Sequence, residues 1–94
     1  MSEYKIAHIK EQGVNLIIIP LESSFGSKSE DDQNDIIAAL QNCAAAADLA
    51  GTVIPVWRSG SSHRFIGPPN WHPFLKSFTW NAIMRSINKR LTCG

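Results

Sequence analysis

The feature that most constrains this chain is a largely apolar run near its start, VNLIIIPL at residues 14–21. Successive side chains of a strand point to opposite faces of its sheet, so three consecutive isoleucines leave neither face polar. Such a run is typical of a strand that is buried on both sides. The run is far too short to cross a bilayer as a helix. We therefore predict a buried strand here and no membrane-spanning segment.

Weaker strand signals precede and follow this run. Side chains alternate over residues 4–10, and a glycine-containing turn then predicts an antiparallel hairpin with 14–21. Residues 52–57, TVIPVW, form a second apolar strand. In it, Pro55 favours an edge position or a bulge, because proline lacks the N–H that a central strand needs. Residues 63–66 are either a short fourth strand or only a loop.

Two segments carry apolar residues at helical spacing. The first covers residues 29–49. The second begins near Pro73, whose fixed φ suits a first helical position, and a restart at Thr79 is the alternative. Its apolar residues lie at i, i+3, i+4, i+7 and i+11, namely Trp80, Ile83, Met84, Ile87 and Leu91.

The predicted order is therefore ββαββα, or ββαβα if the fourth strand is only a loop. A right-handed crossover through the first helix makes the strands on either side of it parallel, so the sheet is mixed. We expect residues 1–94 to form one small two-layer α+β domain with both helices on one face of the sheet. A chain this short would then cover the other face poorly. Because large exposed apolar patches mark interfaces, this predicts a homodimer or another protein partner.

The stretch LESSFGSKSEDD, residues 21–32, has two interpretations. A phosphate-binding loop of the Walker type needs a lysine directly after its second glycine, whereas Lys28 follows a serine. Three carboxylates also come next, and they would repel a phosphate while complementing the positive end of a helix. Ser29 and Asp32 fit the capping pattern S-x-x-[D/E] that begins many helices. We favour the helix start and predict no nucleotide or other cofactor.

Other motifs for chemistry are weak. Cys43 and Cys93 are too few for a disulfide framework and no secretory leader opens the chain, so we expect two reduced thiols in a cytoplasmic protein. Zinc sites normally show ligands paired a few positions apart, and the histidines and cysteines lack that spacing, so no metal is predicted. Serines precede His63, but no nucleophile elbow surrounds them. These patterns lean away from an enzyme.

The richest stretch for recognition is WRSGSSHRFIGPPNWHPF, residues 57–74. Loops carry function more often than cores, and arginine, tryptophan and histidine suit stacking on and pairing with an anionic or aromatic partner. We nevertheless favour a structural role for this stretch, because aromatic side chains bury more often than they bind. The candidate binding residues are Trp57, Arg58, His63, Arg64, Trp71 and His72.

Net charge limits the partners. Nine basic and eight acidic side chains give +1, whereas a general nucleic-acid binder is usually clearly basic, so nucleic acid is an unlikely partner. The leading hypothesis is a non-catalytic interaction module that acts as a homodimer, through an exposed sheet face or the 57–74 segment. The alternative is a small enzyme or anionic-ligand-binding protein with a pocket at His63, Arg64, Trp71 and His72.

Overall fold

The computed structural model describes residues 2–93, which form a small α+β domain around one five-stranded sheet. In chain order, the elements are β1 (Ser2–Glu11), β2 (Val14–Leu21), the 3-10 helix η1 (Ser23–Ser27), α1 (Glu30–Ala46), β3 (Thr52–Ser59), β4 (Ser62–Phe65), the 3-10 helix η2 (Pro69–Trp71), α2 (His72–Ser77), α3 (Trp80–Ser86) and β5 (Lys89–Cys93).

The sheet order is β4-β3-β2-β1-β5. Strands β2 and β3 run parallel across the α1 crossover, and every other neighbouring pair is antiparallel. The predicted α+β class, the mixed sheet and the β-β-α-β-β order are confirmed. β2 has the bounds that its apolar run predicted, and β4 is a strand rather than only a loop.

One face of the sheet is covered by α1. Ile17 and Ile19 of β2 are fully buried and pack in one cluster with Leu40 and Ala44 of α1. These two helical residues are four positions apart, so they lie on the same side of α1. The long helix therefore closes this face with one narrow apolar stripe.

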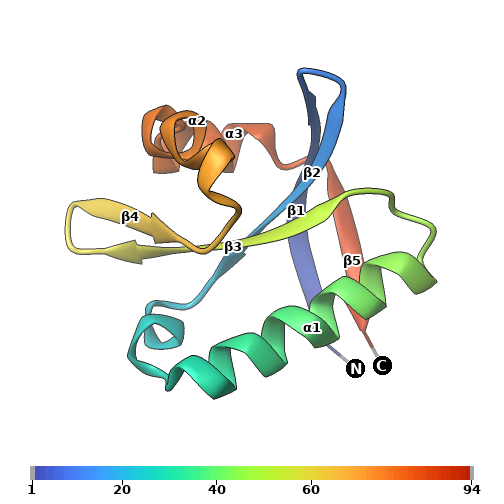
Figure 1. The fold of residues 1–94 in the computed structure, drawn as a ribbon, viewed down its shortest axis with the longest axis horizontal. Helices are drawn as coiled ribbons and strands as arrows, with labels where there is room; N and C mark the ends of the chain where they lie inside the picture. The colour runs from blue at the N-terminus through green and yellow to red at the C-terminus, as the bar shows by residue number, and fades with distance from the viewer. Residues whose placement is uncertain (1, 94) are drawn as a thin grey trace.

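The opposite face is covered by α2 and α3 (Figure 1). Leu16 and Ile18 of β2 pack there with Leu75 of α2 and Ile83 of α3. The predicted α+β class holds, but the expectation of two layers with both predicted helices on one face is wrong. Because β2 is apolar on both sides, each side requires its own helical layer, and the domain has three layers.

This arrangement also removes the argument for a homodimer through a bare sheet face. In residues 2–93, the buried side chains of the sheet belong to the two helix-covered clusters, except Pro55 and Trp57 of β3, and Trp57 packs on Phe25 of η1. The one large hydrophobic residue that is exposed in the described chain is Val14, in the β1–β2 hairpin. Dimerisation itself stays a prediction, but it needs another surface.

Pro55 lies inside the sheet rather than at its edge. Strand β3 is flanked by β2 and β4, and Pro55 is buried opposite Ile19. Its carbonyl accepts a hydrogen bond from the backbone N–H of Ile66, at 3.2 Å, just beyond the end of β4. The N and the C=O of one strand residue point to the same side, so the missing N–H faces the place where β4 has already ended. A proline is tolerated there without loss of a ladder hydrogen bond.

The predicted last helix is two helices and a strand. Thr79 restarts the helix as the alternative predicted, since its hydroxyl accepts a hydrogen bond from the Ala82 N–H at 3.2 Å. The helix ends at Ser86, however, and Leu91 lies in β5, buried against α1 and β1. The expected helical role of Leu91 is therefore wrong.

The two cysteines form a disulfide, which corrects the expectation of reduced thiols. Cys43 of α1 and Cys93 of β5 are bonded, with their Cα atoms 5.8 Å apart. The bond joins the sheet-facing side of α1 to the last strand. Disulfides are more typical of oxidising compartments than of the cytosol, so the cytoplasmic location stays a prediction with this observation against it.

None of the helices in the described part of the chain is both long and apolar enough to cross a membrane.

The start of α1 is capped as the sequence predicted. Ser29 Oγ accepts a hydrogen bond from the Asp32 N–H at 3.1 Å, and three carboxylates occupy the first turn. We expect Ser29→Ala to lower the free energy of unfolding by about 1 kcal/mol, because one helix N–H loses its partner. Urea denaturation checks this, with Ser29→Asn as a control that retains a capping oxygen. An alanine variant as stable as the wild type would contradict the role of the cap.

Candidate functional site

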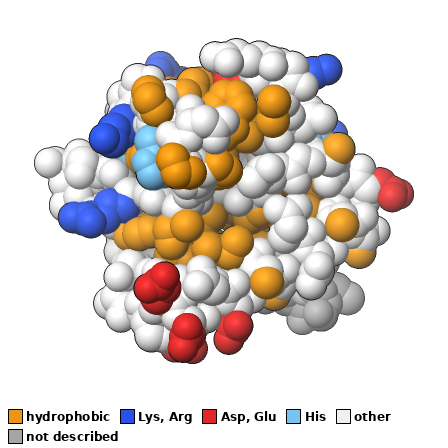
Figure 2. Space-filling view, in the orientation of Figure 1, with side chains coloured by type: hydrophobic (Ala, Val, Ile, Leu, Met, Phe, Trp, Pro, Cys, Tyr) orange, Lys and Arg blue, Asp and Glu red, His pale blue; other side chains and the backbone are white. Residues whose placement is uncertain are grey.

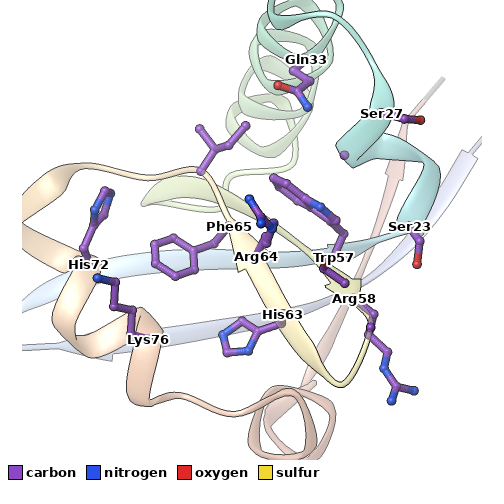
Figure 3. A pocket seen from close by; sticks show the side chains of 14 residues that line it. Ser23, Ser27, Gln33, Trp57, Arg58, His63, Arg64, Phe65, His72 and Lys76 are labelled. Atoms are coloured by element: carbon purple, nitrogen blue, oxygen red, sulfur yellow. The ribbon is translucent and has the colours of Figure 1, made fainter.

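An open groove runs along the outer edge of β4, the edge strand of the sheet (Figure 3). Its volume is about 880 Å³, within the range of small-molecule sites. Side chains from both faces of the β3–β4 hairpin line it, together with η1, the start of α1 and α2. The lining residues central to its chemistry are Trp57, Arg58, His63, Arg64, His72 and Lys76.

The hairpin sends its side chains to two sides of the groove. Trp57 and Arg64 are opposite one another in the β3–β4 register and point to the α1 face. Arg58 and His63 are the next opposite pair and point to the α2 face. Gly60, with φ +62°, forms the tight turn between the strands, a conformation that favours glycine. The short hairpin thus presents one arginine on each side of β4.

The α1 side of the groove is built around Trp57. Its ring packs on Phe25 of η1, with ring centroids 5.0 Å apart, and only 7 % of the residue is exposed. Gly26 lies so close that a Cβ there would overlap the indole nitrogen. Trp57 is therefore a largely buried side chain that forms one wall of the groove, in agreement with the structural interpretation of the aromatic residues in this segment. Arg64 extends beside it into the open space (Figure 3).

The α2 side is built around an aromatic row. Phe65 lies between the imidazoles of His63 and His72, at centroid distances of 6.2 and 5.3 Å. His63 Nε2 donates to the carbonyl of Leu75 at 3.0 Å, and His72 Nε2 donates to that of Gly67 at 2.9 Å. A carbonyl only accepts, so both Nε2 atoms carry hydrogen. The two histidines fasten β4 and the following loop to α2, and Nδ1 is the remaining ring nitrogen of each.

The charge of the groove has one sign. Arg58, Arg64 and Lys76 line it, and no carboxylate is among its lining residues within the described chain. In residues 2–93 the one ion pair joins Arg90 and Glu3, at 3.6 Å, outside the groove. Figure 2 shows blue and pale blue side chains over the β4–α2 side, and red ones over the start of α1. The groove therefore offers three cations without an internal counter-charge.

Five of the six predicted binding residues line this groove: Trp57, Arg58, His63, Arg64 and His72. Trp71 does not. It is 8 % exposed and packs in the core beside Leu75, with its ring edge against Phe74. The predicted pocket at His63, Arg64, Trp71 and His72 is thus formed by three of these residues, and Trp71 lies in the core instead.

Sequence reasoning missed Lys76 and Phe65 as lining residues. Lys76 follows His72 by four positions, so a helix beginning at residue 72 places both on one face. The helical spacing was a signal for Lys76. Gln33 and Ser27 also line the groove, although their stretch was interpreted only as a helix start. They line the groove because η1 packs on Trp57, a tertiary contact that no local sequence pattern predicts.

The metal-ligand types and the serines before His63 are the other residues that bear on chemistry here. No group of three or more potential metal ligands clusters in the searched residues 2–93. Of the serines near His63, Ser62 donates its hydroxyl to the Ser59 carbonyl at 3.2 Å rather than to a histidine. The groove is equipped for binding charge, with aromatic surface beside it.

No family model, no curated protein and no solved structure matches this chain.

Proposed function

We propose that this protein is a non-catalytic binding module that takes an anionic ligand in the groove along β4. The observation that carries the proposal is the charge of the groove: Arg58, Arg64 and Lys76 line it with no lining carboxylate to neutralise them. Arginine forms bidentate, charge-assisted hydrogen bonds with carboxylates and phosphates. The near-zero net charge of the chain makes this local concentration of one sign more specific, since it is not a general property of the surface.

The scaffold supports recognition by a fixed surface. His63 and His72 hold β4 and its following loop to α2 through carbonyl hydrogen bonds, so the cationic side chains extend from a braced framework. A preorganised framework lowers the conformational cost of binding. This function combines two earlier hypotheses, the interaction module acting through residues 57–74 and the anionic-ligand site at the same residues.

Removal of one groove cation tests the proposal. We expect Arg64→Gln to weaken binding of an anionic probe about tenfold, the size of one charge-assisted hydrogen bond. The measurement is a titration of the ¹⁵N-labelled protein with tripolyphosphate, a thymidine oligonucleotide and a glutamate-rich peptide, followed through the amide shifts of β4.

Arg85→Gln is the matched control. It removes an equal charge from an exposed arginine of α3 that is not among the groove residues. Binding should also weaken as salt is added, because exposed charges are screened. Failure of every anionic probe to shift the β4 amides, or equal weakening by both variants, would overturn the proposed function.

A further inference from the structure

The backbone of β4 can form ladder hydrogen bonds on only one of its two sides. β4 has a neighbour on one side only, β3, so its other side faces the groove. The Ile66 N–H bonds to the Pro55 carbonyl, which fixes the phase of the ladder. In an antiparallel pair, successive residues alternate between bonding to the neighbour and facing away. Arg64 therefore bonds toward β3, and His63 and Phe65 direct their N–H and C=O groups outward.

These outward groups belong to two residues that line the groove. His63 and Phe65 are both lining residues, and neither backbone has a partner among the turn and loop hydrogen bonds of residues 2–93. Because His63 and Phe65 are two positions apart, their backbones present two N–H donors and two C=O acceptors along the same edge. That row is the template on which an extended segment adds to the edge of a sheet.

We propose, resting on the anionic-ligand function above, that the ligand is an acidic peptide segment that binds in extended form as a sixth strand beside β4. The backbone of the segment pairs with His63 and Phe65. Its carboxylates meet Arg64 on the α1 side, and Arg58 and Lys76 on the α2 side. Alternate side chains of a strand point to opposite faces, so carboxylates on either face find a cation.

Charge also argues against a second copy as the occupant. Pairing of two β4 edges would bring Arg64 of both copies into one short ladder. Like charges across a strand pair destabilise it, and charged edge strands are a common protection against such pairing. The cations that repel a second copy attract an acidic strand, so the same side chains select the partner.

Backbone pairing is tested on the peptide. The probe is a fluorescein-labelled peptide of alternating glutamate and valine, titrated into the full chain and followed by anisotropy. We expect N-methylation at alternate residues, which removes the donors along one edge, to weaken binding at least tenfold, since each lost hydrogen bond contributes roughly a few-fold. A lysine-for-glutamate peptide should not bind.

Backbone pairing is also tested on the protein. His63→Pro removes the outward N–H, and His63→Ala is the matched control because both lose the imidazole. We expect the proline variant to bind the peptide about tenfold more weakly than the alanine variant. In wild-type protein, the amides of His63 and Phe65 should exchange quickly when free and slowly with peptide, whereas the amide of Arg64 is protected throughout.

The outcomes separate the two proposals. If tripolyphosphate or the oligonucleotide binds while the methylated and unmethylated peptides bind equally, the groove is an anion site without strand addition, and this inference falls alone. If the protein pairs with itself through β4 and the peptide does not compete, a second copy is the occupant and the inference also falls. If no anionic probe binds, both proposals fall. If His63→Pro does not fold, the methylated peptide and the exchange pattern decide.

Discussion

Ile17→Ala and Ile18→Ala should each lower the free energy of unfolding by about 2–5 kcal/mol, although they are neighbours in the chain and point to opposite faces. Ile17 packs in the α1 cluster and Ile18 in the α2–α3 cluster, and both are fully buried. Each substitution leaves a cavity that a helix on that face cannot fill. Chemical denaturation at low protein concentration measures both values.

Val14→Ala is the control, because Val14 in the same strand is 42 % exposed and its loss should cost little. The comparison tests the three-layer fold directly. If one of the two isoleucines could be truncated without loss of stability in the monomer, the corresponding face would not be covered by its own helices. A dependence of that variant's stability on protein concentration would then point to a partner on the bare face.

Reduction of the disulfide should lower the free energy of unfolding by about 4 kcal/mol, a value expected for a cross-link that closes a loop of roughly this length. Cys43 and Cys93 are 50 residues apart, so the bond removes many conformations from the unfolded chain. For a domain of this size, each kcal/mol corresponds to about 4–8 °C in Tm. Thermal unfolding with and without dithiothreitol gives the difference.

The control for reduction is the double variant Cys43→Ala/Cys93→Ala, whose Tm should not respond to dithiothreitol. Thiol counting under denaturing, non-reducing conditions establishes whether the bond is present in the purified protein. Two free thiols per chain, in protein prepared without reductant, would contradict the disulfide. The earlier expectation of separate reduced cysteines would then stand.

Local chemistry was the part of this fold that the sequence predicted best. The bounds of β2, the Ser29 cap and the Thr79 restart all depend on residues within a few positions of one another. The predicted single helical layer conflicts with the apolar run of β2 itself. A strand that is apolar on both faces requires cover on both faces, and the chain has enough helical segments to provide it.

The end of the chain was mispredicted because its decisive contacts are distant in sequence. Leu91 fits both a helical period and a short strand. Asn88 decides between them, since its side chain accepts from the N–H of His8 and donates to the His8 carbonyl, both at 2.9 Å. These bonds join β1 to the start of β5 across 80 positions. The disulfide was missed for a similar reason, because β5 is what carries Cys93 to α1.

For the candidate site too, the residue types were predictable from the sequence, whereas the tertiary contacts were not. The residue types in the 57–74 segment indicated where charge and aromatic surface gather, and the hairpin brings most of them to one edge. Side-chain direction was beyond the sequence: Trp71 is as plausible a binding residue as Trp57 until η2 places it in the core. The contribution of η1 to the groove depends on the packing of Phe25 against Trp57, a tertiary contact.

The pairing of β1 with β5 places both ends of the described chain together, with Ser2 opposite Cys93, while β4 forms the far border of the sheet (Figure 1). β4 lies three strand spacings from β1 and four from β5, roughly 14 and 19 Å. A dye, an affinity handle or a surface tether on either end would therefore stand clear of the groove. A short bridge between the ends, with a new opening cut at the Gly13 turn, should likewise give a circular permutant that keeps the groove unchanged.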